Sequence, residues 1–165
     1  MPRSPLPPPK PVRESQTEMC QVVLPNDTNP LGTILGGTVM HWVDIVAAMA
    51  THRHSGLHVV TASVDHMDFL CPIRMGEIAI LKASVNRVFR TSMEVGVKVF
   101  REENFTNRRE HTSSAYLTFV AVDEYGNPKP VPPALPKSSE EKRRYREAGQ
   151  RRRIQQLGAK PSGLR

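Results

Sequence analysis

The chain has 165 residues, a formal net charge of +7 and 38% hydrophobic residues. This length favours one domain with its own core, and no apolar run approaches the ~20 residues of a transmembrane helix. The two cysteines, Cys20 and Cys71, show no metal-ligand spacing, so we expect reduced thiols and a cytoplasmic protein.

The positive charge lies in the tails of the chain. Residues 17–123 carry nine Lys or Arg against eleven Asp or Glu, a net charge of −2, whereas residues 124–165 carry +7. A nucleic-acid-binding domain concentrates its cationic side chains on the folded part. We therefore expect no nucleic-acid partner for the central part of the chain.

The N-terminal third begins with a proline-rich arm. Residues 1–16 contain six prolines and little to bury, which predicts an extended or disordered segment. Residues 17–24 alternate apolar and polar side chains, which is typical of a strand. The turn-forming residues of segment 26–30 then predict a loop, followed by a tight turn at Gly36-Gly37.

A long apolar helix is predicted after the two glycines, over residues 38–51. A single charged residue, Asp44, interrupts it at the edge of the apolar face. Burying an unpaired carboxylate is costly, so Asp44 needs a bonding partner or a function. The apolar side chains that share one side at helical spacing are Val39, Met40, Val43, Val46, Ala47 and Ala50.

Four more strands are predicted after this helix, and a turn at residues 123–128 ends the domain. Their ranges are 57–70, 77–89, 93–100 and 110–122. One helix and five strands in this order predict an α+β fold, with an antiparallel sheet of about five strands wrapped around a long central helix. The sheet edges left open favour a homodimer.

The C-terminal residues 129–165 predict a proline-rich linker and a basic, partly helical tail. The helix signal is the run Ser138-Ser139-Glu140-Glu141, which has capping serines and acids in the first turn. Two roles remain open for this tail. It could attract an anionic substrate by its charge, or it could be a solvated or assembly helix.

Three stretches of the sequence resemble the hotdog-fold acyl-CoA thioester hydrolases, in the branch of the brain-type long-chain and bacterial short-chain enzymes. They are DTNPLGTILGGTVMHWVD, VVTASVDHMDFLCPIRMGE and AYLTFVAVDEYGNP. The resemblance covers residues 17–128. It implies the hotdog fold and hydrolysis of acyl-CoA to free acid and CoA without a cofactor. It also implies a dimer, or a trimer of dimers, with active sites between subunits.

The resemblance also assigns roles to single residues. It makes Asp44 the general base or the nucleophile and pairs it with Asn29 of the partner subunit. The Gly37 N–H, at the positive end of the helix dipole, is then expected to stabilise the oxyanion. It places Arg90, Thr91 and Ser92 against the nucleotide part of CoA. Each position also has a structural interpretation: a hydrogen-bonded helix acid, a loop turn, a glycine backbone requirement and a solvated hairpin.

Other functions remain open beside hydrolysis. A hydratase of the same fold would use an Asp and a His, but residues 26–40 contain no His. The domain could bind acyl-CoA without cleaving it, or the tail could bind an anionic partner. The six histidines do not converge by spacing, so we expect no metal site.

Overall fold

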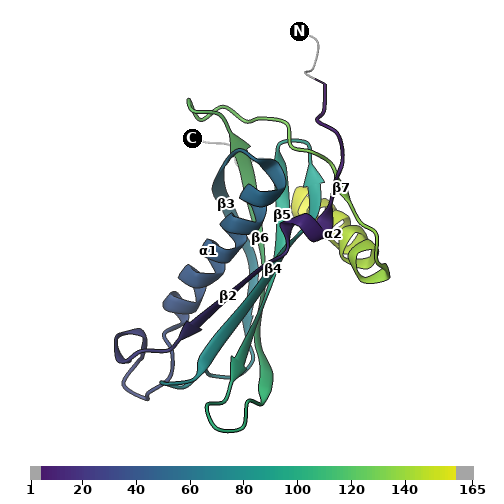
Figure 1. The fold of residues 1–165 in the computed structure, drawn as a ribbon. Helices are drawn as coiled ribbons and strands as arrows, with labels where there is room; N and C mark the ends of the chain where they lie inside the picture. Colours follow the sequence, from purple (N-terminus) through teal and green to yellow (C-terminus); the bar gives the residue numbers. More distant parts are fainter. Residues whose placement is uncertain (1–4, 159–165) are drawn as a thin grey trace.

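The computed structural model describes residues 5–158 and is built around one five-stranded sheet with a long helix on each face (Figure 1). Helix α1 (Gly36–Ser55) and helix α2 (Ser139–Gly158) lie on opposite sides of this sheet. The predicted α+β fold with an antiparallel sheet and a long helix is confirmed. In spatial order the strands are β2 (Thr17–Val22), β4 (Ile78–Phe89), β5 (Ser92–Glu102), β6 (Arg109–Val122) and β3 (His58–Phe69).

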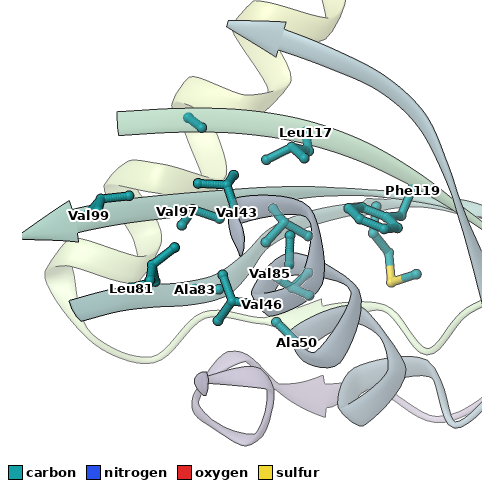
Figure 2. Packing of buried hydrophobic residues seen from close by; sticks show 14 of the residues in the cluster. Val43, Val46, Ala50, Leu81, Ala83, Val85, Val97, Val99, Leu117 and Phe119 are labelled. Atoms are coloured by element: carbon teal, nitrogen blue, oxygen red, sulfur yellow. The ribbon is translucent and has the colours of Figure 1, made fainter. Parts of the chain in front are cut away.

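The core fills the space between α1 and the inner face of the sheet. Figure 2 shows Val43, Val46 and Ala50 of α1 packed against side chains from the strands. Helical spacing predicts this burial, and five of the six expected residues are at most 2% exposed. Met40 differs, since it is 44% exposed and lies at the side of the helix. The buried strand residues labelled in Figure 2 are Leu81, Ala83, Val85, Val97, Val99, Leu117 and Phe119.

Helix α1 is longer than predicted at both ends. It starts at Gly36 and continues to Ser55, and Gly56 ends it in the left-handed conformation with φ of +67°. The Gly56 N–H donates to the His52 carbonyl oxygen at 2.8 Å, which closes the last turn. The loop before the helix contains a short 3-10 helix, η2 (Pro25–Asp27).

The N-terminal arm, predicted as an extended or disordered segment over residues 1–16, is described from residue 5, and residues 1–4 lie outside the described residues. Strand β1 (Lys10–Pro11) pairs in parallel with β7 (Ala134–Leu135), and the 3-10 helix η1 (Val12–Ser15) follows. Val12 and Val131 are 3% and 0% exposed and belong to the core cluster. The packed unit therefore extends beyond residues 17–128 on both sides, because two proline-rich segments pair with each other and bury one valine each.

Helix α2 is docked on the outer face of the sheet. Arg151 binds both carboxylate oxygens of buried Glu94, at 2.7 and 3.0 Å, and its guanidinium lies 3.8 Å from the centre of the Tyr116 ring. Arg87 lies 4.3 Å from the Tyr145 ring centre and passes close to Gly149, where an added Cβ would come within 2.2 Å of its guanidinium. The basic tail is thus held against the sheet as far as Arg152.

His54 ties the end of α1 to the proline-rich linker. It is 1% exposed, its Nε2 lies 2.9 Å from the Pro132 carbonyl oxygen, and its buried Nδ1 has no partner among the described residues. Burial lowers the pKa of His54 below 6.5, although the bond to Pro132 opposes this shift. The folded protein therefore favours the neutral imidazole.

This lowered pKa makes stability depend on pH. His54 contributes fully to the unfolding free energy above its ordinary pKa near 6.5. This contribution is lost as the pH falls through the lowered pKa, because the unfolded chain binds the proton more readily than the folded one. We expect His54→Gln, which keeps a donor for Pro132, to flatten the fall in unfolding free energy between about pH 7 and pH 5. Urea unfolding at a series of pH values measures this pH dependence. His58→Gln, at an exposed position, serves as the control. Equal pH slopes for the wild type and His54→Gln would contradict this expectation.

Candidate active site

Asp44 lies halfway along α1, half-buried at the side that faces strand β3. The Thr61 hydroxyl of β3 donates to Asp44 Oδ1 at 2.7 Å. No Lys or Arg pairs with this carboxylate among the described residues, and its second oxygen accepts no protein hydrogen bond there. The carboxylate is therefore held in position by one neutral donor and keeps capacity to bind water or attack a substrate.

The first turn of α1 carries uncovered N–H groups. Leu35 is the N-cap residue and makes no side-chain cap, and the first bonded amides are those of Thr38 and Val39. Gly37 is exposed, and its N–H has no acceptor among the described residues. This N–H lies at the positive end of the helix dipole, where a developing negative charge is stabilised.

Asn29 organises the loop before the helix. Its Oδ1 accepts from the Leu31 and Thr33 amides at 3.0 and 3.2 Å, and its Nδ2 donates to Thr33 Oγ1 at 2.9 Å. Asn29 makes no hydrogen bond with Asp44 within one chain. Gly37 and Asp44 are seven residues apart on the same helix, which separates them by ~10 Å. A single chain thus does not bring the three predicted catalytic residues to one point.

The predicted CoA-binding turn connects β4 to β5. Arg90 is exposed and has a φ of +72°, Thr91 is half-buried, and Ser92 begins β5. Ser92 is only 7% exposed, which leaves Arg90 and Thr91 as the parts of the predicted set that a ligand can reach most directly. Ser92 differs because it already belongs to β5, where it pairs with Phe89 of β4 and with Val120 of β6.

An apolar pocket lies beside the uncovered start of α1. Its volume is about 330 Å³, and the segment that follows β3 forms one of its walls. Phe69 reaches the helix start, since a Cβ on Gly36 would lie 3.6 Å from its ring. The lining residues are Ile34, Gly36, Val39, Phe69, Leu70, Cys71, Pro72, Ile73 and Ser113.

Sequence reasoning missed Thr61 and this pocket. Thr61 had no local signal, because its bond to Asp44 depends on where β3 lies relative to α1. The pocket had none either, because its walls come from the start of α1 and the loop before it, the end of β3 and the segment that follows it, and one residue of β6. A larger groove of about 800 Å³ lies on the outer face, and most of its cations are paired with carboxylates.

Neither a metal cluster nor a membrane helix occurs in the described part of the chain. Residues 5–158 contain no group of three or more His, Cys, Asp or Glu side chains placed to hold a metal ion. Within the same range, no helix is long and apolar enough to span a bilayer.

Comparison with known proteins identifies the family. A family described as Thioesterase superfamily matches residues 31–105. The uncharacterized acyl-CoA thioester hydrolase YkhA of Bacillus subtilis is 41% identical over 129 residues, which cover 78% of this chain and 75% of that protein. The chain belongs to the acyl-CoA thioester hydrolases. The predicted family, fold and enzyme class are thereby confirmed.

Solved structures of hydrolases agree with this assignment. An acyl-CoA hydrolase from Staphylococcus aureus, solved with butyryl-CoA and CoA, has a TM-score of 0.85 and 40% identity over 91% of this chain and 92% of its own. A hexameric acyl-CoA thioesterase has a TM-score of 0.89 and 42% identity over 96% of this chain and 99% of its own. The S. aureus enzyme has also been solved with single Asn-to-Ala, Asp-to-Ala and Thr-to-Ala substitutions.

Proposed function

We propose that this hydrolase cleaves acyl-CoA thioesters with water to give a carboxylic acid and CoA. The observation that carries the proposal is the Asp44 carboxylate, held by Thr61 and free of cationic partners, on the central helix of a member of this family. The reaction needs no cofactor, because a thioester carbon accepts an oxygen nucleophile and the CoA thiolate is a good leaving group. Water supplies the oxygen of the acid and the proton of the thiol.

Asp44 starts the reaction in this proposal. It removes a proton from water as the water attacks the thioester carbon, or it attacks directly and forms a mixed anhydride that water then cleaves. The Thr61 hydroxyl fixes one carboxylate oxygen, so the other faces the reacting atoms. The Gly37 N–H of the partner subunit stabilises the oxyanion, and Asn29 of the partner subunit orients the water or the carbonyl.

The division between subunits is supported by the geometry of one chain, and the choice of residues is supported by the single substitutions of the S. aureus enzyme. Asn29 and Gly37 belong to the loop and the helix start, whereas Asp44 lies two turns further along the helix. The residue types replaced in the S. aureus enzyme, one Asn, one Asp and one Thr, match Asn29, Asp44 and Thr61 in kind. A second subunit that presents its Asp44 to the loop would complete the site.

A homodimer through β3 provides that second subunit. Strand β3 ends the sheet order and pairs only with β6 among the described strands. Its exposed apolar residues and those of neighbouring α1 form one surface, and pairing two copies would bury it. The residues of this surface are Met40, Ile45, Val60 and Val64, which are 37–49% exposed. The hexameric relative supports a trimer of such dimers.

The apolar pocket beside α1 takes the acyl chain in this proposal. A methylene group needs about the volume of a water molecule, about 30 Å³, so the pocket holds a chain on the order of ten carbons. Substrates of short and medium length then fit entirely, and the thioester carbonyl lies near the Gly37 N–H. The cytoplasmic location predicted from the sequence remains a prediction.

The test is release of free thiol from acetyl-, butyryl-, octanoyl- and palmitoyl-CoA. We expect hydrolysis with butyryl- or octanoyl-CoA ahead of palmitoyl-CoA, since the longest chain exceeds the pocket. Crotonyl-CoA incubated with the enzyme tests the hydratase alternative, because hydration removes its conjugated double bond without thiol release. Tight CoA binding without turnover of any thioester would instead support a non-catalytic binding protein.

A further inference from the structure

The second half of α2 lies beside the turn between β4 and β5. The guanidinium carbon of Arg152 is 5.4 Å from the ring centre of Phe89, the last residue of β4. Arg87 approaches the same ring at 5.5 Å. Arg90 follows Phe89 directly in the chain and is exposed. Arg87 of β4 and Arg152 of α2 therefore lie at one aromatic ring, and Arg90 of the turn is the next residue in the chain.

These arginines differ in what they bind. Arg87 donates to the Tyr145 carbonyl oxygen at 3.3 Å and stacks on the Tyr145 ring, so it holds α2 to the sheet. Arg152 and Arg90 form no ion pair with any carboxylate of residues 5–158. Three other arginines of α2 are paired: Arg143 with Glu147, Arg144 with Glu140 and Arg151 with Glu94. Arg146 and Arg153 form no ion pair in this range, but they lie on exposed positions and have no aromatic ring beside them.

The turn lies within reach of a ligand bound at Asp44. Ser92 pairs with Val120 of β6, and Val120 pairs with Val60 of β3. Two strand spacings of ~4.8 Å separate Ser92 from Val60, the neighbour of Thr61. An acyl-CoA is much longer than these ~10 Å, so a thioester at Asp44 leaves its nucleotide end free to reach the turn.

We propose that Arg152 is a substrate-binding residue that meets, together with Arg90, the phosphates of the 3′-phospho-ADP part of CoA. This inference rests on the proposed acyl-CoA hydrolysis and gives the basic tail a fixed role. The Arg151–Glu94 pair docks α2, and the Phe89 ring supports the Arg152 guanidinium from one side. The remaining N–H groups form a planar fork that matches phosphate oxygens, and no carboxylate competes for them.

The test compares two thioesters on the full-length protein. Butyryl-CoA carries the nucleotide, whereas butyryl-pantetheine lacks it and presents the same thioester. We expect Arg152→Ala to raise KM for butyryl-CoA about tenfold with little change in kcat, the effect of one lost charge-assisted hydrogen bond. KM for butyryl-pantetheine should stay at the wild-type value. Arg152→Lys keeps the charge, so its KM for butyryl-CoA should lie between those of the wild type and Arg152→Ala.

Two further variants separate binding from structure. Arg146→Ala removes the same charge from an exposed position of α2 that makes no described contact, and it should leave KM unchanged. Arg151→Ala removes the partner of buried Glu94 and should lower the melting temperature, whereas Arg152→Ala should not. An unchanged KM for butyryl-CoA in Arg152→Ala would overturn the proposal, and so would an equal rise for both thioesters.

Calorimetric titration with CoA separates this inference from the proposed function. CoA binding that weakens about tenfold in Arg152→Ala supports the inference even when no thioester is hydrolysed, and that result would contradict only the hydrolysis. Hydrolysis by the wild type combined with equal CoA affinity in both proteins would contradict only the role of Arg152.

Discussion

Asp44→Asn is expected to lower kcat by at least about two orders of magnitude while the protein stays folded, the usual loss for a positioned general base. Asparagine has the same shape and can still accept the Thr61 hydroxyl, so the packing of α1 against β3 should survive. It cannot take a proton from water or form a mixed anhydride. Thiol release under substrate saturation measures kcat, and circular dichroism checks the fold.

The chain offers a matched control for this substitution. Asp65 of β3 also accepts a threonine hydroxyl, from Thr118 at 2.7 Å, and it receives a second bond from Ser63. Asp65→Asn removes one carboxylate of the same local chemistry outside the proposed site, and turnover should stay near the wild-type value. A folded Asp44→Asn protein that hydrolyses acyl-CoA at the wild-type rate would remove Asp44 from the mechanism.

Local periodicity was sufficient to predict the elements of the fold. The buried face of α1 follows from residues spaced three and four apart, and the sheet follows from β-branched residues between turn signals. Strand β4, predicted at residues 77–89, forms over Ile78–Phe89. The ends are less predictable because contacts outside the element decide them. Ser92 joins β5 through its pairing with Val120 of β6.

The packed termini could not be predicted, because both depend on non-local contacts. Pairing of Lys10 with Ala134 joins segments that are more than a hundred residues apart, and each segment alone is only an extended proline-rich stretch. Helix α2 has almost no apolar stripe. Its docking uses Arg151 against Glu94 and Tyr116, a contact between a cation, an acid and an aromatic ring that no helical periodicity reveals.

The candidate site was likewise predictable only where the signal is local. Asp44 is noticeable in the sequence because it is a lone charge in an apolar helix, and the family resemblance supplies its proposed role. The Thr61 bond and the pocket near Phe69 and Cys71 require the relative positions of α1 and β3. The joint use of Asn29 and Asp44 requires more than one chain, so it stays a prediction.

Mixing two inactive variants should restore activity if the sites are shared between subunits. We expect Asn29→Ala and Asp44→Ala each to be inactive alone. In a mixed dimer, one site then combines both defects, and the other combines the intact Asn29 of one subunit with the intact Asp44 of its partner. Random exchange makes half of the dimers mixed, so activity should recover to about a quarter of the wild-type value.

The comparison that decides this point is a double variant. Subunits carrying both Asn29→Ala and Asp44→Ala, mixed with either single variant, leave every site with a defect and should stay inactive. Subunit exchange is verified by native mass spectrometry with one variant isotopically labelled, so a lack of recovery cannot be attributed to unmixed dimers. If exchanged single variants remain inactive, each site lies within one subunit. In that case Asn29 serves only the loop, where it already accepts the amides of Leu31 and Thr33.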